Sequence, residues 1–384
     1  MTALLRFLAD EVAFRGRGPE TLIHYVTSRC NARCEHCYFL TKLNAKTDLT
    51  REETFRLIPK LGRLRALLVA GGEPFLCDHL ADLLAEYHHG CGVRFAQIPT
   101  LGYHHGRIRR TLEAVAQTCP TLDLTVNVSI DGFQPFHDAN RKVKGAFDHA
   151  VETLRWLVAW RGLHMPRLRV NVVSVLMPAT LAQLRPLAEW LRDEVDPDLH
   201  ILEIVREKDF HAQNGTRAEV EALVEFWTGL TRFYYAKPTT CRNLYLHPWL
   251  RRMVGEFAVL NLETAARNFL DGAAWPAPCQ AGRKIAVLYP EGDLAVCELR
   301  GRLLNVKDHG LDVRAAMRTD TFQADVAKVP IDKCFCTHGC FIPPSMRHAP
   351  SQLFKVAWRA LRYGQGGQRT ESVKELTQTK EIAK

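Results

Sequence analysis

Hydrophobic runs alternate with amphipathic stretches over the first half of the chain. Six segments rich in Val, Ile and Leu predict strands, at 22–27, 66–70, 93–98, 122–130, 168–176 and 199–205. Helix start signals lie between them, such as the capping box Thr50–Glu53, and Pro186 is expected to kink or split one helix. Strands joined through helices by short connections require a parallel sheet with the helices outside. The pattern predicts an α/β fold, as a partial (β/α)6 TIM-like barrel or an open doubly wound sheet.

The pattern changes after residue 205. Two helices are predicted at 216–235 and 247–270, followed by a β-hairpin of 285–289 and 294–298 around the turn Pro290–Asp293. A cysteine-rich loop and a basic helix come next. We therefore expect five regions: an N-terminal extension (1–20), a barrel (21–210), a helical connection (211–272), a small cysteine-rich domain (273–345) and a basic C-terminal helix with a flexible tail (346–384).

Composition indicates a globular protein with a substantial core. Of the 384 residues, 47% are hydrophobic and 24% charged. Arg6, Asp10 and Glu11 interrupt the N-terminus, so it does not read as a secretory signal, and no apolar run approaches the roughly 18 residues of a membrane helix. These features favour a cytoplasmic protein. The net charge of +9 favours an anionic partner only weakly, and no RNA-binding motif is recognisable.

Cysteine placement is the most informative part of the composition. The chain has 12 cysteines, which form one group at 30–37, a second group at 279–340 and a scattered set of Cys77, Cys91, Cys119 and Cys241. In a reducing compartment, clustered cysteines indicate metal ligands or reactive thiols rather than disulfides. The scattered ones are expected to be small buried hydrophobic residues.

The first group, Cys30, Cys34 and Cys37, follows the first predicted strand. This is the sheet edge where α/β folds place their active sites. Thiolates separated by three and two residues can wrap one four-iron cubane and leave its fourth iron open. Structural zinc is the alternative, but it needs four closed ligands, and only His36 or a distant cysteine is available as the fourth.

This spacing resembles the CxxxCxxC signature of radical S-adenosylmethionine (SAM) enzymes, although His36 stands where that family usually has an aromatic residue. The resemblance implies a [4Fe–4S] cluster whose open iron binds the amino and carboxylate groups of SAM. It also implies reductive cleavage of SAM to methionine and a 5′-deoxyadenosyl radical, with an electron donor such as flavodoxin or ferredoxin.

Gly71, Gly72, Glu73 and Pro74 end the second predicted strand. The two glycines permit close backbone approach, and Glu73 offers an acceptor for an ammonium group. Alone, these residues would be read as a turn. Their place on the strand resembles the GGEP motif that holds the methionine amine in radical SAM enzymes.

Ser129 and Arg141 lie after the fourth strand, in segments that resemble the SLDG and HDxxR sequences of peptide-modifying radical SAM enzymes. The resemblance implies that both side chains hold the carboxylate of SAM, and the guanidinium fork suits that group. The alternative is a helix-capping serine and a surface arginine.

The second cysteine group resembles the SPASM and twitch domains of this family. Cys279 and Cys297 flank a glycine at the family's spacing, and Cys334, Cys336 and Cys340 follow. Five cysteines cannot ligate two four-iron clusters, so the resemblance implies one auxiliary [4Fe–4S] cluster. Cys279, Cys297 and Cys340 are the firmer ligands, with Cys334 or Cys336 as the fourth and structural zinc as the alternative. Such a cluster would accept an electron from a substrate radical or ligate the substrate.

Glu298 directly follows Cys297. In sulfatase-maturing relatives an acidic residue there deprotonates the substrate, so the resemblance implies a catalytic Glu298, against the alternative of a surface residue on the hairpin. His211, Tyr234, Tyr235 and His247 are further candidates to line the same cavity.

The last predicted helix carries an apolar stripe beside a basic one: Phe354, Trp358 and Leu361, and Lys355, Arg359 and Arg362. We expect a helix docked on its own domain, with contact to an anionic partner or lipid headgroups as the alternative.

The sequence as a whole predicts hydrogen abstraction from an unactivated C–H, followed by oxidation or maturation of a peptide or small metabolite. The rival interpretation is a non-enzymatic iron–sulfur or zinc protein that carries electrons or binds a partner.

Overall fold

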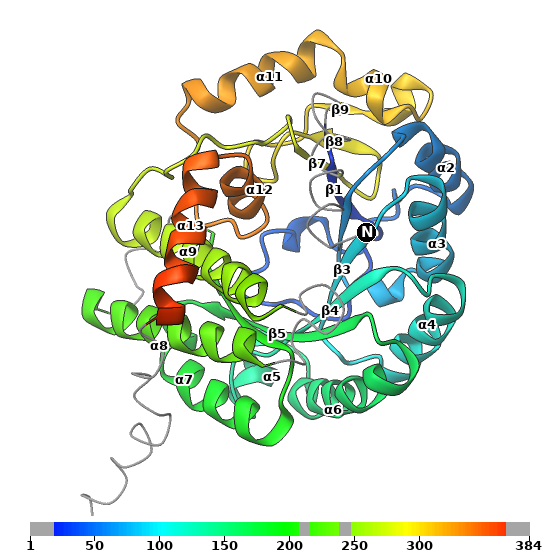
Figure 1. Ribbon diagram of the computed structural model, residues 1–384. Coiled ribbons are helices and arrows are strands. Elements are labelled where there is room, and N and C mark those ends of the chain that lie inside the picture. Colours follow the sequence, from blue (N-terminus) through cyan, green and yellow to red (C-terminus); the bar gives the residue numbers. More distant parts are fainter. Residues whose placement is uncertain (1–18, 207–215, 238–246, 366–384) are drawn as a thin grey trace, which may run out of the picture.

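The computed structural model describes residues 19–206, 216–237 and 247–365. Within them, six parallel strands form the main sheet: β1 (Thr21–Tyr25), β2 (Ala66–Ala70), β3 (Phe95–Thr100), β4 (Asp123–Ser129), β5 (Leu168–Leu176) and β6 (Leu199–Ile204). Their spatial order follows their order in the chain. A doubly wound sheet would instead reverse direction at a switch point. The sequential order selects the partial barrel, and the curved sheet is visible in Figure 1.

The connecting helices lie outside this sheet: α2 (Arg51–Leu57), α3 (Leu80–Gly90), α4 (His105–Thr118), α6 (Ala146–His164) and α7 (Leu181–Trp190), with the short α5 (Phe136–Arg141) at the strand ends (Figure 1). Thr50 and Glu53 form the expected capping box at the start of α2. Pro186 lies inside α7 without splitting it.

The predicted hairpin is present, but it continues the barrel sheet. β7 (Ile285–Leu288) pairs parallel with β1, with Thr21 opposite Ile285, and β8 (Asp293–Ala295) and β9 (Leu304–Asn305) follow antiparallel. β1 therefore has a neighbour on each side, and all its residues are buried. The cysteine-rich residues are thus attached to the barrel through its first strand.

The remaining helices are α8 (Arg217–Ala236), α9 (Pro248–Asp271), α10 (Val313–Met317), α11 (Asp320–Ile331), α12 (Ile342–Arg347) and α13 (Pro350–Gln365). α9 lies between α8 and α13, as Figure 1 shows. None of the helices in the described ranges is long and apolar enough to cross a membrane.

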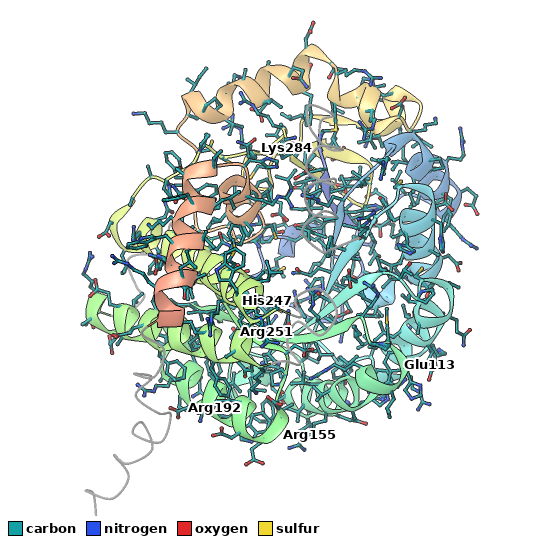
Figure 2. All side chains as sticks on the ribbon, in the orientation of Figure 1. Glu113, Arg155, Arg192, His247, Arg251 and Lys284 are labelled. Atoms are coloured by element: carbon teal, nitrogen blue, oxygen red, sulfur yellow. The ribbon has the colours of Figure 1, made fainter. Side chains whose placement is uncertain are left out.

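The core fills the space between the sheet and the outer helices. Cys77, Cys91 and Cys119 are buried in it, which confirms that these scattered cysteines behave as small hydrophobic residues. Cys241 lies outside the described residues. Charged side chains such as Glu113 on α4 and Arg155 on α6 lie on the outer helices (Figure 2).

Candidate active site

The first cysteine group occupies the loop after β1, at the carboxyl edge of the sheet. The side chain of Asn44 fixes the backbone of Cys30, because its Oδ1 accepts from the Cys30 N–H at 3.0 Å and its Nδ2 donates to the Cys30 carbonyl at 3.1 Å. The Cys37 N–H donates to the Cys34 carbonyl at 3.2 Å. The loop is therefore held by local hydrogen bonds with its three cysteines half-buried.

The three thiols share one environment. Burial raises the pKa of Cys30 to about 12, and Glu73, Cys34 and Cys37 add to the increase. Bound metal takes thiolates, so cluster assembly here must displace protons. In the described ranges, no three His, Cys, Asp or Glu side chains converge tightly enough for a single metal ion. A cubane takes each thiolate on a different iron, so three cysteines at this spacing have the donor chemistry for one.

Gly72 brings the end of β2 against the cysteine loop. A Cβ at this position would lie 2.2 Å from the Arg29 carbonyl oxygen and 2.9 Å from the Cys30 Cβ. The Gly72 N–H donates to the Thr27 carbonyl at 2.9 Å. Gly71 has φ 141°, a conformation that other residues rarely adopt. The glycines are therefore needed so that two strand ends can touch beside Cys30.

Glu73 is buried next to these glycines. Its carboxylate accepts from the Phe75 N–H at 3.2 Å and from the Leu101 N–H at 2.8 Å. Burial raises the pKa of Glu73 to about 7, against the lowering effect of these hydrogen bonds. Pro74 then begins a short 3-10 helix. The group is thus poised between its neutral and anionic forms beside Cys30.

Ser129 and Arg141 occupy different positions relative to the cysteines. Ser129 is the half-buried last residue of β4, and its role as a SAM ligand stays a prediction. Arg141 ends α5 and is buried, which excludes a surface arginine. One terminal nitrogen lies 2.8 Å from Asp131 and the other donates to the Cys34 sulfur at 3.7 Å.

Four members of the second cysteine group lie close together. Burial raises the pKa of Cys279 to about 11, with contributions from Cys336 and Cys334, and also raises the pKa of Cys297, with contributions from Cys336 and Cys279. Burial also raises the pKa of Cys340. The other main influences on this pKa come from Arg206 and nearby carboxylates.

Glu298 lies at the centre of a buried polar network. Its carboxylate accepts from the Tyr38 hydroxyl at 2.6 Å and from Arg206 at 3.3 Å, and it also contacts the Tyr25 hydroxyl and His338 Nε2. Burial would raise the pKa of Glu298, but His338 and Arg206 outweigh it and hold the pKa at about 2. Glu298 is therefore an engaged carboxylate rather than an exposed hairpin residue.

Sequence reasoning missed the partners of Glu298. Tyr38 follows Cys37 directly and His338 lies between Cys336 and Cys340, so their positions next to cysteines were the available signal. Arg206, just after β6, carried no such signal.

The other cavity candidates have local roles. The Tyr234 ring is buried in the core, and His247 Nδ1 accepts from the Trp249 N–H as the N-cap of α9. Tyr235 packs against Gly255. His211 lies outside the described residues.

Comparison with protein families gives a match to the Radical SAM superfamily over residues 24–191. This range runs from β1 to the end of α7 and includes the first cysteine group.

Relatives align with the barrel or with most of the chain. The chain is 32% identical over 144 residues to the pre-heme d1 synthase of Dinoroseobacter shibae, covering 37% of this chain and 34% of that protein. It is 26% identical over 291 residues to the mycofactocin maturase MftC of Mycobacterium tuberculosis, covering 73% of this chain and 64% of the maturase. The matches therefore span less than two thirds of either relative.

Solved structures share the fold. The chain superposes on anSMEcpe with bound AdoMet and a Cp18Cys peptide with a TM-score of 0.54 at 14% identity, covering 91% of this chain and 99% of that one. For SuiB of Streptococcus suis bound to S-adenosylmethionine, the TM-score is 0.53 at 15% identity, covering 84% and 72%. The family match, the strand order and the cysteine loop at the carboxyl edge of β1 agree, and together they support a radical SAM domain over residues 24–191.

Proposed function

We propose that this chain is an enzyme that holds a [4Fe–4S] cluster on Cys30, Cys34 and Cys37 and abstracts hydrogen from an unactivated C–H. When bound, the reduced cluster and SAM supply a 5′-deoxyadenosyl radical for that step. The observation that carries the proposal is the contact between Gly72 and the cysteine loop, because it joins two family motifs at one sheet edge. A non-enzymatic metal protein has no need of this arrangement.

The side chains around the loop would bind and orient the cofactor. Glu73 lies close enough to Cys30 to raise the pKa of its thiol. A carboxylate has acceptor capacity beyond two backbone donors, so Glu73 can still accept from the SAM ammonium group. Ser129 is proposed to hold the carboxylate of SAM from the end of β4. The same role was expected of Arg141, but both of its terminal nitrogens already have protein partners.

The second cysteine group is proposed to hold one auxiliary [4Fe–4S] cluster. Cys279 and Cys297 come from the two sides of the hairpin, and both lie near Cys336. This supports Cys336 as the fourth ligand beside the expected Cys340, because Cys336 acts on the pKa of both Cys279 and Cys297, whereas Cys334 is among the main influences only for Cys279 of this pair. A closed set of thiolates suits electron transfer. We therefore favour an oxidation in which this cluster accepts the electron of the substrate radical.

The substrate is proposed to be a peptide, with a small metabolite as the second choice. Relatives that match more than two thirds of this chain are named maturases. Structures of SuiB bound to its precursor peptide and of anSMEcpe with a peptide share the fold. The synthases of heme-type products match over the barrel half only. A cytoplasmic location and a flavodoxin or ferredoxin donor complete the proposal, because iron–sulfur chemistry of this kind needs a reducing compartment.

Iron binding and SAM cleavage test the proposal together. Anaerobic reconstitution should load about eight irons per chain for two four-iron clusters, and replacement of Cys30, Cys34 and Cys37 by alanine should remove about half of them. The matched control is Cys119→Ala, which removes a buried thiol of the core and should keep all the iron. With dithionite, the wild-type chain should convert SAM to 5′-deoxyadenosine. Bound zinc, or a loaded protein without affinity for SAM, would favour the non-enzymatic alternative.

We propose separately that the C-terminal helix α13 contacts a membrane surface. α13 docks on α9 as expected, but through Val356 and Ala360, while Phe354 is 75% and Trp358 46% exposed. The exposed apolar side of an amphipathic helix with basic neighbours suits anionic lipid headgroups. Sedimentation with anionic vesicles, compared with zwitterionic ones, tests it. Equal recovery in both pellets would remove the proposal.

A further inference from the structure

The guanidinium of Arg141 lies between an acid and a cysteine of the first group. One terminal nitrogen lies 2.8 Å from Asp131 Oδ2, and the other donates to the Cys34 sulfur at 3.7 Å. The side chains of Arg141 and Asp131 are 9% and 0% exposed. Solvent therefore screens neither the ion pair nor the contact with sulfur.

Asp131 is fixed by further donors. Its Oδ1 accepts from the Val175 N–H at 3.0 Å, and its Oδ2 accepts from Asn140 Nδ2 at 2.8 Å. Burial opposes ionisation of Asp131, but Arg141, His36, His137 and the hydrogen bond from Val175 together outweigh it and lower the pKa of the acid. The result is a permanent anion in a fixed position, which holds the arginine by a charge-assisted hydrogen bond.

The backbone at the end of α5 holds the cysteine loop in register with this side chain. The Arg33 N–H donates to the Arg141 carbonyl at 3.3 Å, and the Glu35 N–H donates to the Asn140 carbonyl at 3.2 Å. Arg33 and Glu35 are the residues on either side of Cys34. These two backbone contacts hold Cys34 beside the guanidinium of Arg141.

We propose that Arg141, positioned by Asp131, donates a charge-assisted hydrogen bond to the Cys34 sulfur and thereby raises the reduction potential of the cluster bound there. The inference rests on the proposed function, because it needs the first cluster. Reduction adds negative charge to a cluster, and hydrogen bonds to its sulfurs and the local net charge set its potential. A buried cation at Cys34 favours the reduced state, and the anion behind it limits the effect.

The arrangement gives Arg141 a different role from the one that the family resemblance implies. An arginine that binds the carboxylate of SAM changes the affinity for SAM and leaves the cluster of the SAM-free protein unchanged. An arginine that donates to Cys34 changes the potential of the cluster before SAM arrives. Arg141 is thus a positioning residue for the cluster, and the two roles have different readouts.

A redox titration of the full-length, SAM-free protein tests the proposal, with the first cluster identified as the paramagnetic signal that changes when SAM is added. Arg141→Gln should lower the ratio of reduced to oxidised cluster about tenfold at a given potential, which equals about 59 mV for a one-electron couple. Asp131→Asn should shift the potential in the opposite direction, because it removes the compensating anion. A loss of packing alone would not give shifts of opposite sign.

Arg33→Gln is the matched control. It removes the same charge from an exposed side chain of the same loop and should leave the potential nearly unchanged. If Arg141→Gln loses its iron, Asp131→Asn is titrated against Arg141→Lys, which keeps the charge and should stay near the wild-type potential. A wild-type potential in Asp131→Asn, or in an iron-loaded Arg141→Gln protein with weakened SAM binding, would overturn the inference. A wild-type chain without iron would instead refute the proposed function, and this inference with it.

Discussion

The hydroxyl of Tyr38 donates a 2.6 Å hydrogen bond to the carboxylate of Glu298. Tyr38 directly follows Cys37 of the first cysteine group, and Glu298 directly follows Cys297 of the second. Two groups that are more than half the chain apart in sequence are therefore joined by one side-chain contact. The position of one candidate cluster relative to the other depends on this contact and on the network around it.

Loss of the Glu298 carboxylate should destabilise the fold. Glu298→Ala leaves the half-buried Arg206 with one carboxylate fewer, and breaking a largely buried ion pair costs up to about 3–5 kcal/mol. Urea unfolding measures the difference. Glu225→Ala, on the exposed side of α8, is the control and should change stability by no more than about 0.5 kcal/mol. Equal midpoints for both variants would show that the network contributes nothing to stability.

Cofactor affinity should rise with pH through the titration of Glu73. Its pKa is about 7 in the folded protein against an ordinary value of 4.5, so the group is largely neutral at pH 6 and anionic at pH 8. Only the anion pairs with the SAM ammonium group, so SAM should bind more tightly at pH 8, as isothermal titration would measure. Because the raised pKa belongs to the folded state, Glu73 also lowers the stability of the SAM-free protein as pH rises from about 4.5 to 7.

Glu73→Gln is the control for this pH dependence. The amide stays neutral throughout, so its SAM affinity should be weak and should not follow the titration of residue 73. A wild-type affinity that is the same at pH 6 and pH 8 would argue against contact between Glu73 and the ammonium group.

Gly72→Ala should separate β2 from the cysteine loop. The added methyl would lie 2.2 Å from a backbone oxygen, so the loop must move, at a cost of about 1–3 kcal/mol. We expect reduced iron content of the first cluster and weakened SAM binding. Gly229→Ala in α8 has no heavy atom within 4 Å of the new methyl and should keep both, with slightly higher stability from helix propensity. A fully loaded Gly72→Ala protein would show that the close approach is dispensable.

Replacing the cysteines of the second group should remove the auxiliary cluster and leave SAM cleavage intact. Cys279→Ala and Cys297→Ala remove ligands from the hairpin only, so about half of the iron should remain, with its spectrum still sensitive to SAM. Cys336→Ala should have the same effect, whereas Cys334→Ala should retain more iron. If Cys334→Ala loses the cluster and Cys336→Ala keeps it, the assignment of the fourth ligand is reversed.

Local patterns predicted the barrel well, because each β–α unit is encoded within a short segment. β5 was predicted with its exact bounds, and the capping box at Thr50 is present. The pairing of β7 with β1 was missed, since nothing in either strand records a partner so distant along the chain. Pro186 was expected to kink or split its helix; α7 is not split, and the kink stays a prediction.

The candidate site, like the fold, was predicted from the sequence only in part. Motif spacing predicted the cysteine loop and the glycines that meet there, because both are properties of adjacent residues. Glu298 was found by its position after a cysteine, but its environment was not. Its partners Tyr38, Arg206 and His338 come from three separate segments, and only the folded chain brings their charges and hydroxyls together.

The pairing of β1 with β7 also sets an order of events during synthesis. β1 leaves the ribosome well before β7, so one of its edges stays unpaired until Ile285–Leu288 has been made. An open hydrophobic edge is a site for wrong pairing, and such distant contacts form slowly. The cysteine loop attached to β1 is therefore translated long before its strand has both neighbours. β1, and the cysteine loop that follows it, therefore acquire their final surroundings only after β7 has been synthesised.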